Sequence, residues 1–164
     1  MIRLKKLKLY KISENYIEFL RETDPVNVKY NKNQRRPYIG IVFSIHQFLY
    51  FAPLASPKSK HLHMKNSLDF IKIEQGKLGA INLNNMIPVP PNAILEFDIS
   101  KEEESYRNLL YGQLNFISKH GNEICSKAEK LYCSVTQYHS YLEKRCAKFK
   151  KLEEKSQLYS EKSI

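Results

Sequence analysis

Basic, hydroxyl and imidazole side chains gather in two stretches of this sequence, at residues 25–36 and 53–66. The first stretch carries Tyr30 and Arg35-Arg36, and the second carries the run SPKSKHLHMK, which starts at Ser56. These residue types suit cleavage of RNA without a metal ion, in which the 2′-hydroxyl attacks the neighbouring phosphate. One group must accept the hydroxyl proton, another must protonate the leaving 5′-oxygen, and fixed positive charge must stabilise the phosphate. Lys and Arg can supply the charge, and His or Tyr can move the protons.

The same residues also have structural interpretations. Lys58 and Lys60 suit a solvated loop, Ser56 suits a turn before Pro57, and Tyr30 suits a packing ring. They form a site only if the fold brings the two stretches together.

The charge of the whole chain favours a polyanionic ligand. The sequence has 27 Lys and Arg against 17 Asp and Glu, with a formal net charge of +10 and a pI of about 9.4. A protein this basic attracts polyanions over long range, and phosphate binding through counterion release is the commonest reason. Solubility alone and the binding of a basic helix to a membrane surface are the alternatives.

Other site chemistries lack their motifs. The sequence has no Gly-rich phosphate loop, no dinucleotide fingerprint, no HExxH and no clustered acidic pair for magnesium. His61 and His63 would share one face of a strand and could bind zinc together with His46, but no matching Cys or carboxylate spacing supports this. We therefore predict neither a metal nor a cofactor. The three Cys residues and the lack of a signal peptide or an apolar span favour a reducing cytoplasm.

Sequence patterns predict a sheet-rich first part. All seven prolines precede residue 100, among short apolar runs typical of strands and turns. Strands are predicted at residues 4–12, 38–45, 48–52, 69–73, 78–83, 86–89 and 94–99. His46-Gln47 and Gln75-Gly76-Lys77 are predicted turns, and residues 53–66 a loop.

Helices are predicted from capping residues and apolar spacing. A short helix follows Ser13 as its N-cap. Ser100, with Glu103 three residues later, is typical of a capping box that opens a helix to about His120. A further helix follows Gly121, and its buried stripe is predicted to comprise Ile124, Ala128, Leu131, Val135, Tyr141, Leu142, Cys146, Phe149 and Leu152.

The predicted fold class is α+β, with a strongly twisted antiparallel, barrel-like sheet, packed helices and a helical C-terminal half. The length fits a single domain over residues 1–164. The sheet and one short helix occupy about 1–99, and the other helices occupy about 100–160.

Several segments, taken in order, resemble a known family. They are YKISENYIEFLR, RPYIGIVFSI, FLYFAPLASPKSKHLHMK, KLGAINLNNMIPVP and RCAKFKKLEEK. They resemble the ToxN/AbiQ/CptN family, the protein toxins of type III toxin–antitoxin systems, from about Leu9 to Lys155. The APLxSPK segment followed by GxINxNNMIPVP is the most specific part.

The resemblance implies a metal-independent endoribonuclease with a sheet like that of the Kid/MazF toxins and added helices. It implies cleavage of single-stranded RNA, often at A-rich sites, to leave a 2′,3′-cyclic phosphate. The implied partner is an RNA antitoxin of short pseudoknotted repeats, which the toxin processes and with which it closes into a ring. Such systems abort phage infection.

Carried over residue by residue, the resemblance assigns the catalytic site to Tyr30, Arg36, Ser56, Lys58 and His61. Lys58 and Arg36 would hold the scissile phosphate, Ser56 would orient the 2′-hydroxyl or the phosphate, and Tyr30 or His61 would assist a proton transfer. Relatives often have Lys in place of Arg36, and Thr or Ser in place of Ala55, whose methyl group cannot donate a hydrogen bond. The neighbouring residues expected to bind RNA are Lys29, Arg35, Lys60, His63 and Lys65.

Two other functions stay open from the sequence. The charge equally supports an RNA-binding module with no catalysis. A basic helical scaffold for acidic proteins or lipid surfaces would rest on residues 122–155, but their narrow, mixed-charge stripe fits core packing better. The cleavage motif, the antitoxin sequence and the number of toxin–RNA pairs in a ring do not follow from the sequence.

Overall fold

The computed structural model describes residues 6–159 and has the predicted α+β architecture. Its strands are β1 (Lys8–Ile12), β2 (Tyr38–Ile45), β3 (Phe48–Ala55), β4 (Phe70–Lys72), β5 (Ala80–Asn82), β6 (Ile87–Pro88) and β7 (Ile94–Glu96). Its α-helices are α1 (Glu14–Arg21), α2 (Ser59–His63), α3 (Glu104–Lys119), α4 (Gly121–Thr136) and α5 (Phe149–Gln157). All seven predicted strands are present, most of them shortened at one end or both. Residues 4 and 5 of the first predicted strand lie outside the described part of the chain.

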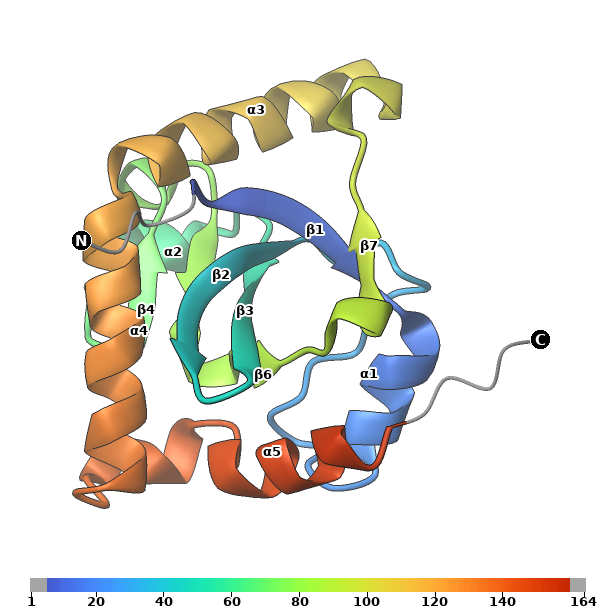
Figure 1. The fold of residues 1–164 in the computed structure, drawn as a ribbon. Helices are drawn as coiled ribbons and strands as arrows, with labels where there is room; N and C mark the ends of the chain where they lie inside the picture. The colour runs from blue at the N-terminus through green and yellow to red at the C-terminus, as the bar shows by residue number, and fades with distance from the viewer. Residues whose placement is uncertain (1–5, 160–164) are drawn as a thin grey trace.

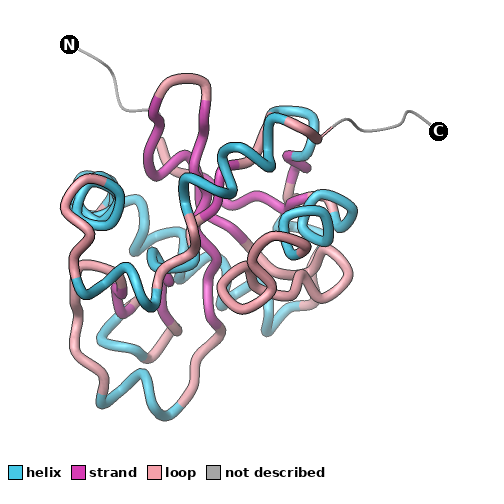
Figure 2. The backbone as a smooth tube through the Cα atoms, turned by 90° about the horizontal axis from the view of Figure 1, so that it is seen from below, coloured by secondary structure: helices cyan, strands magenta, loops and turns pink. Residues whose placement is uncertain are grey.

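The strands form one antiparallel sheet in the order β4-β5-β3-β2-β1-β7, and β6 pairs with β3 beside this path. Figure 1 shows α3, α4 and α5 along three sides of the sheet, and Figure 2 shows the longer strands crossing the middle of the molecule with helices on either side. The barrel-like closure predicted from the sequence is wrong for the described residues. The end strands β4 and β7 have three residues each and pair only with β5 and β1, so the sheet stays open.

The hairpin of β2 and β3 is the centre of the sheet and confirms the predicted strand at 38–45. Its turn is at His46-Gln47, where His46 has a φ of 52°. The register pairs Tyr38 with Pro53, and the Leu54 amide donates to the Pro37 carbonyl over 3.0 Å. The segment that enters β2 and the segment that leaves β3 therefore lie side by side at the end of the hairpin opposite the turn.

The region predicted as a loop at 53–66 is partly ordered secondary structure. Strand β3 continues to Ala55, because β5 extends the ladder through pairs of Leu54 with Ile81 and of Ala55 with Ala80. Helix α2 then occupies Ser59–His63. The predicted strand ends at Ala52, before Pro53, but a proline can stand in a strand where its missing N–H is not needed.

The predicted start of α3 is also wrong. Ser100 lies in a short 3₁₀ helix, and Asp98 caps it by accepting from the Ser100 amide. Glu103 is the N-cap of α3 itself, and its carboxylate accepts from the Ser105 and Tyr106 amides. An acidic side chain at this position satisfies free amides of the first turn, so Glu103 caps the helix instead of completing a box with Ser100.

The predicted buried stripe of the C-terminal helices is confirmed except at one position. The residues on α4 are buried, as are Leu142, Cys146, Phe149 and Leu152, whereas Tyr141 is 77% exposed. Tyr141 starts a 3₁₀ helix (Tyr141–Arg145) whose tighter winding turns this ring to solvent. No helix within residues 6–159 combines the length and apolar character that a membrane crossing requires.

A buried carboxylate fixes α5 to the rest of the core. Glu153 on α5 accepts hydrogen bonds from the Tyr50 and Tyr132 hydroxyls over 2.5 and 2.6 Å. Burial and the carboxylate raise the pKa of both phenols, so they stay protonated donors. The three residues join β3, α4 and α5 through one charge-assisted network.

We expect Glu153→Ala to lower the free energy of unfolding by about 3 kcal/mol, because two buried hydroxyls lose their acceptor. Urea denaturation measures the change. The neighbouring Glu154→Ala is the matched control and is expected to change stability by less than about 0.5 kcal/mol, because Glu154 is exposed. Equal effects of the two substitutions would contradict the role of Glu153.

Candidate active site

The end of the β2–β3 hairpin brings the two basic stretches together. Arg36 stands two residues before Tyr38, the residue paired with Pro53, and Ser56 stands three residues after Pro53. The antiparallel register therefore places the loop before β2 beside the loop after β3. The juxtaposition on which the candidate site depends follows from this pairing.

The loop before β2 is tied to α1 and β1 by side-chain hydrogen bonds. The buried Asn31 donates to the Ile12 carbonyl over 2.9 Å. Gln34 accepts from the Glu14 amide, and its own amide donates to the Glu14 carboxylate, both over 3.0 Å. Arg36 Nε donates to the Tyr30 carbonyl over 2.9 Å and links the middle of the loop to its end before β2. These bonds hold the basic loop in one conformation.

The loop after β3 rests on two glycines. A Cβ on Gly79 would stand 2.0 Å from the Ala55 carbonyl oxygen, and one on Gly76 would stand 2.4 Å from that of His61. Both glycines also have positive φ, of 98° and 93°. Only glycine allows this approach, so the turn at 76–79 supports both the start of the loop and helix α2.

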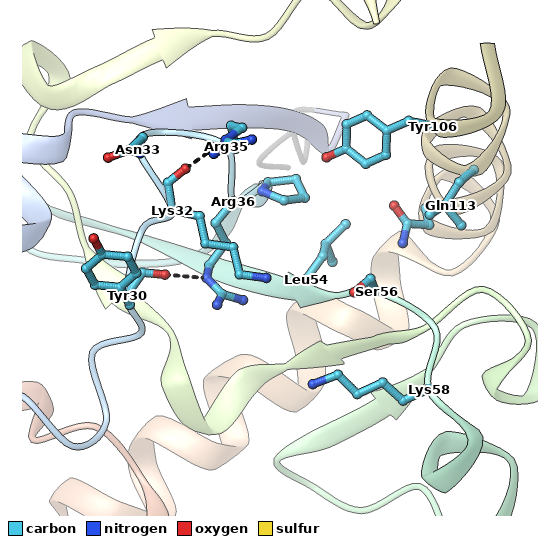
Figure 3. A pocket seen from close by; sticks show the side chains of 12 residues that line it. Tyr30, Lys32, Asn33, Arg35, Arg36, Leu54, Ser56, Lys58, Tyr106 and Gln113 are labelled. Atoms are coloured by element: carbon cyan, nitrogen blue, oxygen red, sulfur yellow. Dashed lines mark hydrogen bonds between the residues drawn. The ribbon is translucent and has the colours of Figure 1, made fainter. Parts of the chain in front are cut away.

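A cavity of about 520 Å³, here called the Tyr106 cavity, opens between the loops and α3. Tyr106, Leu109 and Gln113 line it from α3. Figure 3 shows the side chains of Lys32, Arg36 and Lys58 directed into the space between the loops. The predicted site residues that line this cavity are Tyr30, Arg35, Arg36, Ser56 and Lys58.

A second cavity of about 620 Å³, here called the Arg145 cavity, adjoins the first. The predicted residues that line it are Lys29, Arg36, Lys58, Lys60, His61 and Lys65, and the chain also contributes Asn82, Asn84, Asn85 and Arg145. Its one carboxylate within the described lining is Asp69, which Arg145 binds through two hydrogen bonds of 2.7 and 2.8 Å. Because that charge is already paired, an anion in the cavity meets net positive charge.

Arg36 and Lys58 line both cavities and therefore stand between them. The Tyr106 cavity has no acidic residue among its described lining residues. Positive charges crowd here: burial and then Arg36 lower the pKa of Lys29, and Arg36 and then burial lower that of Lys32. Such unpaired cations repel each other, and a bound polyanion relieves the repulsion.

We expect RNA binding to raise the pKa of Lys29 and Lys32 back toward 10.5, because a bound phosphate favours the protonated amines. Binding then takes up protons, so affinity for RNA rises as the pH falls through these lowered values. NMR titration of the lysine side chains, with and without RNA that cannot be cut, measures the change. Titration curves that stay the same when RNA is added would contradict the prediction.

His61 lies in the wall of the Arg145 cavity and is 1% exposed. Its Nδ1 accepts from the Lys58 amide over 3.2 Å, and its own amide donates to the Lys58 carbonyl over 2.9 Å. Burial, followed by the charges of Lys60 and Lys58, lowers the pKa of the ring below 6.5. A neutral ring with Nδ1 as acceptor carries its proton on Nε2.

The structure thus brings nine of the ten predicted site residues to the two cavities. His63 is the exception, since it is exposed at the end of α2 and lines neither cavity. The zinc alternative placed His61 and His63 on one face of a strand, which is wrong because they lie on a helix, one buried and one exposed. Among residues 6–159, no three His, Cys, Asp or Glu side chains are grouped as metal ligands would be.

Several lining residues were missed from the sequence. Lys32 lies within the first basic stretch and could have been included on charge alone. Tyr106 and Gln113 belong to α3, far along the chain from both basic stretches, and their spacing of seven fits a helix face without revealing what that face covers. Arg145 is close to Asp69 only through the tertiary fold.

The chain resembles known proteins over almost its whole length. The family model described as toxin ToxN of a type III toxin–antitoxin system matches residues 8–157. Endoribonuclease ToxN of Bacillus thuringiensis subsp. kurstaki is 34% identical, with 94% of this chain and 85% of that protein covered. Endoribonuclease ToxN of Pectobacterium atrosepticum is 36% identical over 80% of this chain and 82% of its own length. Endoribonuclease AbiQ of Lactococcus lactis subsp. lactis is 28% identical over 96% and 91%.

Solved structures agree with these sequence comparisons. A type III system toxin inhibited by a non-coding RNA pseudoknot superposes with a TM-score of 0.82 and 33% identity, over 96% of this chain and all of that chain. AbiQ, described as a lactococcal anti-phage endoribonuclease, superposes with a TM-score of 0.80 and 28% identity, over 96% of this chain and all of that chain.

Proposed function

The chain belongs to the ToxN toxin family of type III toxin–antitoxin systems, and on this premise we propose that it is a metal-independent endoribonuclease for single-stranded RNA. The observation that carries the proposal is the positive charge of Arg36 and Lys58 between two adjoining cavities, which has no salt-bridge partner among residues 6–159. An RNA strand that passes from one cavity to the other puts a phosphate between these two side chains.

In this mechanism, Arg36 and Lys58 hold the scissile phosphate. The 2′-hydroxyl attacks the phosphorus, the bond to the 5′-oxygen breaks, and the products are a 2′,3′-cyclic phosphate and a 5′-hydroxyl. Charge develops on the phosphoryl oxygens as the fifth bond forms, and fixed cations that already point at this position stabilise it. Ser56, exposed at the rim of the Tyr106 cavity, orients the 2′-hydroxyl or a phosphate oxygen.

Tyr30 and His61 have different roles in the proposed mechanism. Protonation of His61 at Nδ1 would break its hydrogen bond from the Lys58 amide, and its lowered pKa disfavours the charged ring. We therefore assign His61 to positioning Lys58 and to donating a hydrogen bond from Nε2. Tyr30 is 55% exposed and lines the Tyr106 cavity, and it takes part in one of the two proton transfers.

The RNA-binding residues are Lys29, Arg35, Lys60 and Lys65, with His63 at the outer margin. Ala55 pairs with Ala80 inside the sheet and lines the Arg145 cavity, and because its side chain is a methyl group the mechanism uses no hydroxyl there. Asn84 and Arg145 add polar groups to the same cavity as His61, and the Asn84 side chain donates to the Arg145 carbonyl over 3.2 Å.

The partner in this proposal is an RNA antitoxin of pseudoknotted repeats that occupies the same cavities, is processed there and closes with the toxin into a ring. Inhibition by a non-coding RNA pseudoknot in the similar structure supports this partner. Anti-phage activity of AbiQ supports a role in abortive infection. The likeness of the sheet to Kid/MazF toxins and a cytoplasmic location stay predictions.

The proposal is tested by incubating the purified protein with single-stranded RNA in excess EDTA and analysing the ends of the products. Cutting with 2′,3′-cyclic phosphate ends is expected. Tight, salt-sensitive binding without cutting would instead support the non-catalytic RNA-binding module, because binding alone needs only the charge.

A further inference from the structure

Gln113 presents a buried oxygen without a partner at the Tyr106 cavity. Its side chain is 2% exposed, and within residues 6–159 nothing donates a hydrogen bond to its Oε1. Its Nε2 donates to the Leu78 carbonyl over 2.9 Å. Because that carbonyl can only accept, the bond fixes which end of the amide is nitrogen and leaves the oxygen on the cavity side.

A buried acceptor without a donor lowers stability, and such groups in native proteins need an explanation. The bond to Leu78 explains the nitrogen of Gln113 but not its oxygen. Figure 3 shows the amide extending from α3 on the side where Ser56 lies, with the ring of Tyr106 beside it. A donor on a ligand in the cavity would complete the hydrogen bonding.

The surroundings of Gln113 suit a flat ring. Tyr106, Leu109 and Gln113 are three and four residues apart and share one face of α3. Leu54 and Pro37 line the same cavity from the hairpin. Unpaired RNA bases are recognised in this way, by stacking on an aromatic side chain and by hydrogen bonds to an edge of the base.

We propose that the face of α3 formed by Tyr106, Leu109 and Gln113 is a base-recognition subsite, in which Gln113 Oε1 accepts from the exocyclic amino group of adenine or cytosine. Guanine and uracil carry a carbonyl oxygen at the corresponding ring position, and two acceptors facing each other repel. The subsite therefore selects amino bases over keto bases at one position of the strand. This inference rests on the proposed ribonuclease function and adds the residue that reads the base.

Access to Oε1 requires a small rearrangement. Since the oxygen is covered in the unliganded protein, a base reaches it after neighbouring side chains rotate. Tyr106 and Leu109 are only half-buried and lie on the same helix face, so their rotation leaves the helix backbone in place. The bound base then covers the part of the Tyr106 ring that is exposed in the unliganded protein.

The test combines single-atom changes in the RNA with one substitution in the protein. Cleavage rates are measured for RNAs in which each adenine in turn is replaced by purine, which lacks the amino group, or by hypoxanthine, which has a carbonyl there. The protein is the wild type or Gln113→Met, which keeps the length of the side chain and removes its oxygen together with the nitrogen that donates to the Leu78 carbonyl. Cleavage of the unmodified RNA by the wild type is measured first, and its absence would refute the ribonuclease function itself.

At one position, loss of the amino group is expected to slow the wild type about tenfold and to leave the rate of the Gln113→Met variant unchanged. Equal losses in both proteins would overturn the subsite while leaving the ribonuclease intact. The same conclusion would follow if no adenine replacement slowed cleavage and if RNAs with each cytosine replaced by uracil were also cut at the normal rate. If Gln113→Met does not fold, the wild-type series decides alone. A tenfold loss confined to one position then supports the subsite, and uniform rates refute it.

Discussion

Replacement of Lys58 by alanine is expected to lower the rate of RNA cleavage about 10³-fold. Lys58 borders both cavities, and its side chain points into the same space as that of Arg36, so its loss removes fixed charge from the phosphate in the transition state. Lys58 is exposed and its ammonium has no salt-bridge partner among the described residues. The unfolding temperature is therefore expected to stay the same or to rise slightly, because repulsion between cations decreases.

The measurements are single-turnover cleavage and thermal unfolding of the same preparations. Lys130→Ala is the matched control, because it removes one exposed lysine from α4 outside both cavities. A rate for Lys58→Ala within a factor of about three of the control would show that Lys58 is an ordinary RNA-binding lysine.

Arg36 is expected to show a graded response, with about a 10²-fold loss of cleavage for Arg36→Ala and about a tenfold loss for Arg36→Lys. Lysine keeps the charge beside the phosphate. It lacks the planar guanidinium, however, which can donate to the Tyr30 carbonyl from Nε and to the phosphate from its other nitrogens. Arg36→Lys therefore separates the charge of the residue from its shape.

The matched control for this series is Arg35→Lys. Arg35 is more exposed, and its Nε donates to the Lys32 carbonyl over 3.2 Å, so the proposal gives it a role in binding alone. Comparison of single-turnover rates at saturating RNA distinguishes the two residues. If Arg36→Lys and Arg35→Lys lose activity equally, the placement of Arg36 at the scissile phosphate is wrong.

The sequence predicts the sheet and the central part of the site because both depend on local signals. The mostly apolar run Tyr38–Ile45 and the predicted turn at His46-Gln47 indicate the hairpin, and its register is enough to bring Arg36 and Ser56 together. The type of residue at these positions indicates phosphate chemistry. The resemblance to the toxin family then selects among lysines that composition cannot distinguish.

What the sequence does not predict depends on contacts between distant segments. The buried environment of His61 comes from α2, a helix of five residues too short to recognise from apolar spacing, and from the turn at Gly76. The role of Gln113 depends on where α3 lies against the hairpin. The sheet is open at β7 because no further strand pairs with its outer edge among the described residues. The three residues of β7 carry no sequence pattern that predicts whether this edge is paired.

The central claim is that the 2′-hydroxyl of the RNA is the nucleophile and that the protein supplies the remaining groups. Its most direct test is an RNA with a single 2′-deoxynucleotide on the 5′ side of the mapped cleavage site, incubated with the wild-type protein in excess EDTA. We predict that this RNA binds about as well as the all-ribose strand and stays intact at that bond, while the all-ribose strand is cut to a 2′,3′-cyclic phosphate. Cleavage of the deoxy-substituted bond would contradict the mechanism, because another nucleophile would then be attacking the phosphate.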